Sequence, residues 1–288
     1  MKQLHSFFTF LAIVGITGFA NATNVGTSIT ISDKNYDANS PTSAGNWYSN
    51  REDNETELNP ATITKQVWDL EGMYLNNSAL SLVGGFDFKN GNLEGGHVYK
   101  SGDIFIDVTG NAKYGQAANG GSGTTVWGGT QTVSNSFGYD YVIDFNDSMT
   151  AYTVFQITPS SLVKRVTDVP SSNPWRYVSG GIAVAGYENV AIGGYGLLAA
   201  SEYNTLTTFG STSPGLKGDS GSNNHFFLTV DLSFLPGDTL TTLHYTLECG
   251  NDNLMGQFTT PHVPEAGTTV ALLGFALLGL VGVRRFSR

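Results

Sequence analysis

The sequence predicts an all-β protein: a single jelly-roll-like β-sandwich with long loops, preceded by a signal peptide and followed by a short transmembrane helix. Three observations support this fold class. Short segments of alternating apolar and polar residues recur between clusters of Gly, Asn, Asp, Ser and Pro, and no internal segment shows helical periodicity. Each end of the chain carries an apolar run. Many short strands separated by turns are typical of sandwiches.

The amino end predicts a signal peptide over residues 1–22. Lys2 supplies the positive start, residues 7–19 form the apolar stretch, and Ala20 and Ala22 are the small residues that signal peptidase requires. We therefore expect signal peptidase to cut after Ala22 and the chain to be exported. An uncleaved amino-terminal anchor is the alternative.

The carboxyl end predicts a short membrane span over residues 266–283. Its continuous apolar part, residues 270–283, is fourteen residues long, below the ~20 residues of a comfortable span. Arg284, Arg285 and Arg288 follow it, and such clusters stay on the cytoplasmic side. The body of the protein is therefore expected outside the inner membrane.

A short motif precedes this span and reads Val263-Pro264-Glu265-Ala266-Gly267. The segment 263–288 resembles the PEP-CTERM class of bacterial sorting signals, especially its VPDSG variant, although Ala266 replaces the second Pro of the usual motif. The resemblance implies an exosortase-type processing enzyme acting at Pro264, Glu265, Ala266 and Gly267, and a place at the cell surface or in the extracellular matrix. A Gram-positive sortase signal and an uncut anchor that faces the periplasm are the alternatives.

Residues 23–262 are expected to form one β-sandwich domain with an irregular arm up to about residue 60. The clearest predicted strands cover residues 104–108, 139–145, 152–157, 226–232 and 242–249, and the last two read as half-buried. Weaker candidates cover residues 28–32, 65–75, 80–88 and 177–185. The Gly-rich residues 111–136 predict a long loop.

Four internal segments also resemble sequences common in exosortase-sorted surface proteins. They are residues 68–72, 101–107, 173–177 and 248–252. The resemblance implies a shared domain and no particular activity.

Composition excludes a nucleic-acid partner. The chain has 14 basic and 24 acidic residues, a formal net charge of -10, whereas nucleic-acid binders show a clustered excess of Lys and Arg. The lone Cys249 alternates onto the apolar face of its strand, which predicts an inert buried thiol.

The amino-terminal arm holds the best metal-binding candidates. Asp33, Asn35, Asp37 and Asn39 place oxygen ligands at alternate positions, as a calcium loop does. The EF-hand pattern is not met, because Ala38 and Ala44 stand where that loop needs Gly and Glu. Calcium is thus a possible cofactor, and a solvated polar turn is the alternative.

Catalytic candidates rest on carboxylate pairs, since glycoside hydrolysis needs two carboxylates ~5–9.5 Å apart. Glu248 with Asp252 is the first pair to consider and Asp103 with Asp107 the second. Exposed strand carboxylates without a catalytic role are the alternative. The chain has no zinc pattern and no G-x-S-x-G elbow.

Aromatic residues suggest glycan binding, because flat aromatic rings match the apolar faces of sugars. Trp127 lies in the Gly-rich loop and is the favoured ligand-binding residue, whereas Trp68 and Trp175 are expected in the core.

Together these features predict an exported surface or matrix protein that is a non-enzymatic binding or structural component associated with exopolysaccharide. A polysaccharide-active hydrolase or lyase on the same scaffold is the alternative, and a plain adhesin or coat protein is the third class.

Overall fold

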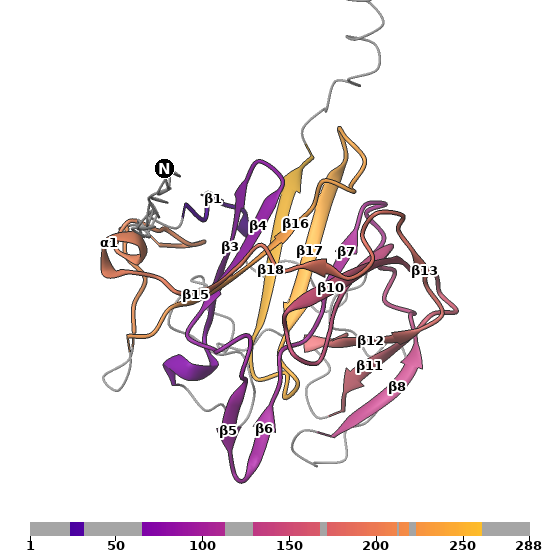
Figure 1. Ribbon diagram of the computed structural model, residues 1–288, viewed down its shortest axis with the longest axis horizontal. Coiled ribbons are helices and arrows are strands. Elements are labelled where there is room, and N and C mark those ends of the chain that lie inside the picture. Colours follow the sequence, from indigo (N-terminus) through magenta and orange to yellow (C-terminus); the bar gives the residue numbers. More distant parts are fainter. Residues whose placement is uncertain are drawn as a thin grey trace, which may run out of the picture.

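The computed structural model describes residues 24–31, 65–112, 129–167, 172–211, 213–218 and 223–260 (Figure 1). Within these ranges the protein is nearly all β-structure, with a short 3₁₀ helix, Gln66–Trp68, and a single-turn helix, α1 (Ala200–Tyr203). No helix in the described part of the chain is long and apolar enough to cross a membrane. The predicted signal peptide, most of the arm and the tail with its span lie outside the described residues.

One sheet has five antiparallel strands in the order β1-β3-β4-β16-β15. Their bounds are Thr27–Ser28, Leu70–Asn76, Ala79–Gly84, Phe226–Asp231 and Gly194–Leu197. β3 and β4 form a hairpin at its centre, and Asn77 at their turn has a φ of 55°.

The second sheet has eight strands, which run β13-β10-β9-β7-β17-β18-β2, while β14 also pairs with β10. In that order the bounds are Ile182–Ala183, Ala151–Gln156, Tyr141–Phe145, Ile104–Asp107, Leu240–Thr246, Asn253–Thr259 and Thr30–Ile31, with β14 at Val190–Ala191. The five clearest strands predicted from the sequence correspond to β7, β9, β10, β16 and β17.

The two sheets pack face to face as a β-sandwich around the main hydrophobic core. The core draws on both sheets, with Met73, Leu82 and Leu228 from one and Ile106 and Leu243 from the other. The amino-terminal strand joins the sheets at one edge, because β1 pairs with β3 and β2 pairs with β18. The predicted all-β sandwich is therefore confirmed, and its jelly-roll connectivity stays a prediction.

β18 packs against β3 of the other sheet, and sequence patterning did not predict it as a strand. A Cβ at Gly256 would lie 2.7 Å from Met73 Sδ, so a larger residue there would force the Met73 side chain to move. Asn253, Leu254 and Met255 are all buried, which removes the alternation that reveals a half-buried strand.

A three-stranded sheet, β12-β11-β8, covers the outer face of the eight-stranded sheet. Its strands are Arg176–Ser179, Leu162–Val166 and Thr130–Ser134. A second core lies beneath it, where Phe105 and Val142 meet Val163 and Tyr177. β17 is consequently buried on both faces, so the predicted half-buried strand is corrected: His244 is buried and its Nε2 lies 3.0 Å from the carbonyl oxygen of Pro174.

A two-stranded hairpin, β5 (Asn92–Glu94) and β6 (His97–Tyr99), projects from the sandwich (Figure 1). The ring of Tyr99 anchors it edge-on against Trp68, with the centroids 5.4 Å apart. The hairpin and the three-stranded sheet flank one end of the eight-stranded sheet.

Candidate functional site

Two adjoining hollows lie at the end of the eight-stranded sheet where β7 begins and β9 ends. Both are lined by Lys100, Asp147 and Arg176. The first encloses about 230 Å³ and adds Lys89, Asn90, Gly91, Ser101, Asp103, Phe145, Asn146 and Met149. The second adds His97, Val98, Lys164, Trp175, Tyr177, Val178 and Glu248. We call the two hollows together the lysine groove.

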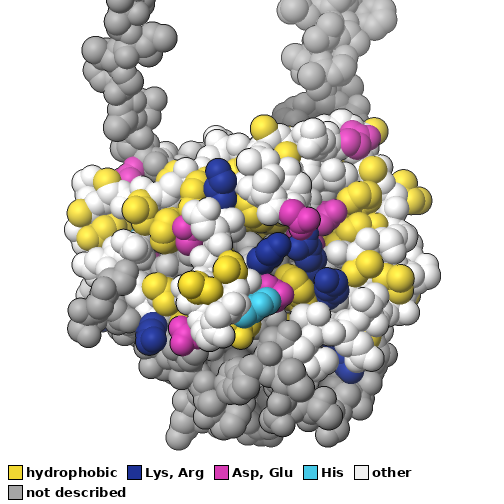
Figure 2. Space-filling model, turned by 60° about the horizontal axis from the view of Figure 1, so that its bottom comes forward, with side chains coloured by type: hydrophobic (Ala, Val, Ile, Leu, Met, Phe, Trp, Pro, Cys, Tyr) yellow, Lys and Arg dark blue, Asp and Glu magenta, His cyan; other side chains and the backbone are white. Residues whose placement is uncertain are grey.

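The groove concentrates positive charge on an acidic protein. Of the seven Lys and Arg residues in the described ranges, four line it, and Figure 2 shows basic side chains gathered beside acidic ones and a His on this face. Lys89, Lys100 and Lys164 have no ion-pair partner among the described residues. Three ammonium groups without ion-pair partners among the described residues, spread over two adjoining hollows, can bind a ligand that carries several negative charges.

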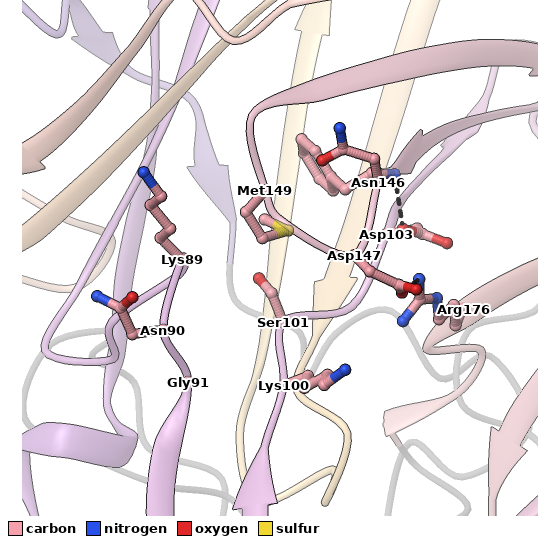
Figure 3. Close-up of a pocket in the computed structure, with 11 residues that line it drawn as sticks. Lys89, Asn90, Gly91, Lys100, Ser101, Asp103, Asn146, Asp147, Met149 and Arg176 are labelled. Carbon is pink, nitrogen blue, oxygen red and sulfur yellow. Dashed lines mark hydrogen bonds and ion pairs between the residues drawn. The ribbon is translucent and has the colours of Figure 1, made fainter. Parts of the chain in front are cut away.

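Aromatic rings hold two of these lysines in place. Lys89 Nζ lies 5.7 Å from the ring centroid of Tyr195, and Lys164 Nζ lies 5.6 Å from that of Trp175. Such cation–π contacts restrain a flexible side chain and leave part of the ammonium group open to solvent. Figure 3 shows Lys89 and Asn90 on one side of the first hollow, across from Arg176.

Lys100 lies on the connection between β6 and β7, which is fixed against the end of β17. Its N–H donates to Glu248 Oε2 at 2.9 Å, and its carbonyl accepts the N–H of Glu248 at 3.0 Å. Gly102 lies two residues further along the same connection. A Cβ at Gly102 would lie 2.3 Å from the carbonyl oxygen of Thr246. A larger residue at 102 would push this connection, and Lys100 with it, away from the groove.

Arg176 forms the middle of the groove and is paired with Asp147. Arg176 Nη2 donates to Asp147 Oδ1 at 2.6 Å, and the Asp147 side chain is 80% exposed. This bond and the positive charge of Arg176 lower the pKa of Asp147. Figure 3 shows the two side chains meeting at the wall of the hollow.

Two further carboxyl groups lie under Arg176 at the ends of β7 and β9. Asp103 is buried, and its oxygens accept the N–H groups of Phe145 at 3.1 Å and Tyr177 at 2.7 Å. Burial and the neighbouring Asp144 raise the pKa of Asp103 well above its usual value. Burial also raises the pKa of Asp144, to about 6, although Arg176 opposes that shift. Both shifts favour the protonated form in this pair, and the two carboxyl groups titrate together rather than independently.

The two residues of the first predicted catalytic pair have different hydrogen-bond partners. Glu248 lies in the groove. Its carboxylate accepts the backbone N–H of Lys100 and lies 3.5 Å from His97 Nε2. Asp252 is buried below it, and its oxygens accept the N–H groups of Leu70 at 2.6 Å and Asn253 at 2.8 Å. The two carboxylates thus have different partners, and that of Asp252 holds the backbone of residues 70 and 253 in place.

The second predicted pair occupies the two ends of one strand. Asp103 and Asp107 are four positions apart on β7, which corresponds to about 13 Å along a strand. That separation exceeds the range over which two carboxylates act on one glycosidic bond. Asp107 is also buried rather than exposed, and accepts the N–H groups of Thr109, Gly110 and Ala112.

The remaining predicted site residues divide into two groups. Trp127 and the calcium candidates Asp33, Asn35, Asp37 and Asn39 lie outside the described residues, so both assignments stay predictions. Within the described ranges no three His, Cys, Asp or Glu side chains gather as metal ligands. Trp68 and Trp175 are buried, as expected, and burial raises the pKa of the Cys249 thiol to about 12.

Sequence patterning did not identify the lysine groove. Lys89, Lys100 and Lys164 are separated by strands and loops, and no local motif links them. One sequence feature could have suggested a basic site. Basic residues are scarce in this chain, so a cluster of several of them on one surface would stand out as a local positive field.

Comparison with known families gives one match, to the VPDSG-CTERM motif, over residues 262–285. The chain ends in a VPDSG-CTERM motif. The match includes Pro264, Glu265, Ala266 and Gly267, and it supports an exported, surface-sorted protein. It is also consistent with processing by an exosortase-type enzyme.

No curated protein and no solved structure is significantly similar to this chain. The VPDSG-CTERM match covers the tail and not the sandwich. The resemblance of the four internal segments to other exosortase-sorted proteins therefore stays a prediction.

Proposed function

We propose that this protein is a surface or matrix component that binds acidic exopolysaccharide in the lysine groove without cleaving it, on a jelly-roll-like scaffold. The observation that carries this proposal is the meeting of Lys89, Lys100 and Lys164, each without an ion-pair partner among the described residues, in two adjoining hollows of an acidic protein. The sorting tail supports a location where such a polymer is present.

The other groups in the groove suit a glycan better than a densely charged polymer. The amide of Asn90 can exchange hydrogen bonds with hydroxyl groups, and the carboxylates of Asp147 and Glu248 can accept them. The same carboxylates would repel a polyanion with closely spaced charges. A polysaccharide in which carboxylates alternate with hydroxyl-rich faces satisfies both sets of groups.

The test is co-elution of the full chain, in mild detergent, with sodium polygalacturonate during size-exclusion chromatography with light scattering. We expect binding that weakens as salt rises, no binding to neutral dextran, and polymer of unchanged mass. The variant Lys89→Gln/Lys100→Gln/Lys164→Gln should bind at least about tenfold more weakly, because several charge contacts are lost together.

The matched control removes the same charge elsewhere: Lys65→Gln/Arg165→Gln/Lys217→Gln carries its changes outside the lysine groove and should bind like the wild type. Equal loss in both variants would show that overall charge, and not the groove, binds the polymer. Shortening of the polymer would overturn the non-enzymatic role in favour of a hydrolase or lyase.

A further inference from the structure

Asp147 occupies an unusual place in the groove. It lines both hollows, and Arg176 is the hydrogen-bond partner of its carboxylate among the described residues. The carboxylate thus lies between the two hollows and occupies a guanidinium group. Guanidinium groups bind carboxylates well, so this is the group to which a carboxylate of a ligand would bind.

A short, well-ordered turn holds Asp147 in this place. Asn146 Oδ1 accepts the N–H of Thr150 at 2.9 Å and the hydroxyl of Ser148 at 3.2 Å, and Met149 has a φ of 50°. The turn fixes the backbone between β9 and β10. The side chain of Asp147 is attached to it only through its own rotatable bonds and through Arg176.

The contact between Asp147 and Arg176 is also easily exchanged. An exposed ion pair contributes little to stability because water screens it and two side chains must be ordered. The Arg176 side chain is only 21% exposed, and the nearby charges of Asp103 and Asp144 raise its pKa together with Asp147, so Asp147 is not the only carboxyl group that favours its charge. Removal of Asp147 from Arg176 would free a hydrogen-bond donor of a residue that lines both hollows.

We propose that Asp147 is an internal competitor, which occupies on Arg176 the position that a carboxylate of the ligand takes on binding. This inference rests on the proposed function and names its ligand class: a glycan with carboxylates on several sugar units. A single anion gains one contact and must displace Asp147 for it. A chain that also reaches Lys89, Lys100 or Lys164 gains linked contacts, which compensate for that displacement.

The experiment is a double-mutant cycle on the full chain, with tetragalacturonate as the probe and affinity measured by calorimetry. Asp147→Asn should tighten binding by about fivefold, which corresponds to the strength of an exposed ion pair. The gain should disappear when Arg176→Gln is added. Glu94→Gln is the matched control, because it removes the same charge from the neighbouring hairpin without contact to Arg176.

Three results would overturn the inference: no gain in Asp147→Asn, an equal gain in Glu94→Gln, or a gain that persists with Arg176→Gln. Thermal unfolding of each variant shows whether it is folded. If wild type binds through the lysines but Asp147→Asn gains nothing, the inference alone fails. If the lysine variant binds normally while the cycle shows coupling, the lysine groove fails and the role of Asp147 stands. If neither wild type nor Asp147→Asn binds, both fail.

Discussion

The two ends of the β7–β9 ladder each carry a pair of aspartates, and they differ in what surrounds the carboxyl groups. The register of this ladder pairs Ile104 with Ile143 and Ile106 with Tyr141. Extended by one residue each way, it sets Asp103 opposite Asp144 and Asp107 opposite Asp140. The same residue type thus appears twice in equivalent positions of one ladder.

At the end away from the groove the carboxylates organise a loop. Asp107 accepts the N–H groups of residues 109, 110 and 112, and Asp140 accepts those of Val108 and Thr109 together with the Thr109 hydroxyl. Each carboxylate is satisfied by backbone donors of the turn that follows β7.

At the groove end the carboxyl groups face each other and an arginine. Asp103 ties β7 to Phe145 and Tyr177, while the raised pKa values of Asp103 and Asp144 reflect burial first. The strand register therefore determines where the aspartates lie. The segments packed around each end determine whether the carboxyl groups bind a loop or lie beneath a charged groove.

The largest expected effect comes from removal of Asp103. Asp103→Ala leaves the buried N–H groups of Phe145 and Tyr177 without an acceptor and should lower the free energy of unfolding by about 3–5 kcal/mol. Urea denaturation followed by fluorescence measures it.

Asp107→Ala is the matched variant at the other end of β7. Thr109 and Gly110 are exposed, so water can replace the lost carboxylate and the loss should be about 1–2 kcal/mol. An equal or larger loss in Asp107→Ala would show that the two ends of the ladder do not differ as described.

A smaller effect is expected in the dependence of stability on pH. The pKa of Asp144 is about 6 in the folded protein, above its ordinary value of 3.8, so the folded state binds this proton more tightly. Its contribution to stability is present below about pH 4 and is lost as pH rises through about 6. The free energy of unfolding should therefore fall as pH rises from 4 to 7. Asp144→Asn should make this fall smaller by about 1–2 kcal/mol, after allowance for solvent screening.

Denaturation at several pH values between 4 and 7 measures this decline in both proteins. Asp147 provides the contrast, because Arg176 lowers its pKa and its contribution is instead lost as pH falls. If wild type and Asp144→Asn show the same change between pH 4 and 6, the pKa of Asp144 is not raised in the folded protein.

The smallest expected effect is at Cys249, which follows β17 at the groove end. With a pKa of about 12, only ~1 thiol in 10⁴ is ionised at pH 8. Ellman's reagent should therefore leave the native protein unmodified and react with one thiol per chain after unfolding in guanidinium. Fast reaction in the native protein would mean that this end of the ladder is open to solvent.

Much of the sandwich could be predicted from residue patterns. β7, β9, β10, β16 and β17 were predicted because each has a face in the core and alternates accordingly. β18 was missed because both of its faces are buried at one end and Gly256 interrupts it where the sheets meet. Burial on two sides removes the periodicity on which such predictions depend.

The candidate site could not be predicted in this way. Lys89 follows β4, Lys100 follows β6 and Lys164 lies in β11, and they meet only because the hairpin, the ladder end and the three-stranded sheet converge. The predicted pairs illustrate a related limit of pattern reading: spacing along the chain does not tell which carboxylates face each other across a sheet. The pair that does meet, Asp103 and Asp144, is 41 positions apart.

The sequence by itself determined the sorting tail, the β-rich fold class and the buried thiol of Cys249, because each depends on a local run of residues: a short motif, an alternation or a place in a strand. Only the tertiary structure decided that unpaired lysines share one groove, that Asp147 lies on Arg176 and that burial raises the pKa values of Asp103 and Asp144 together. Charge, burial and hydrogen bonding act through space, so they depend on segments that only folding brings together.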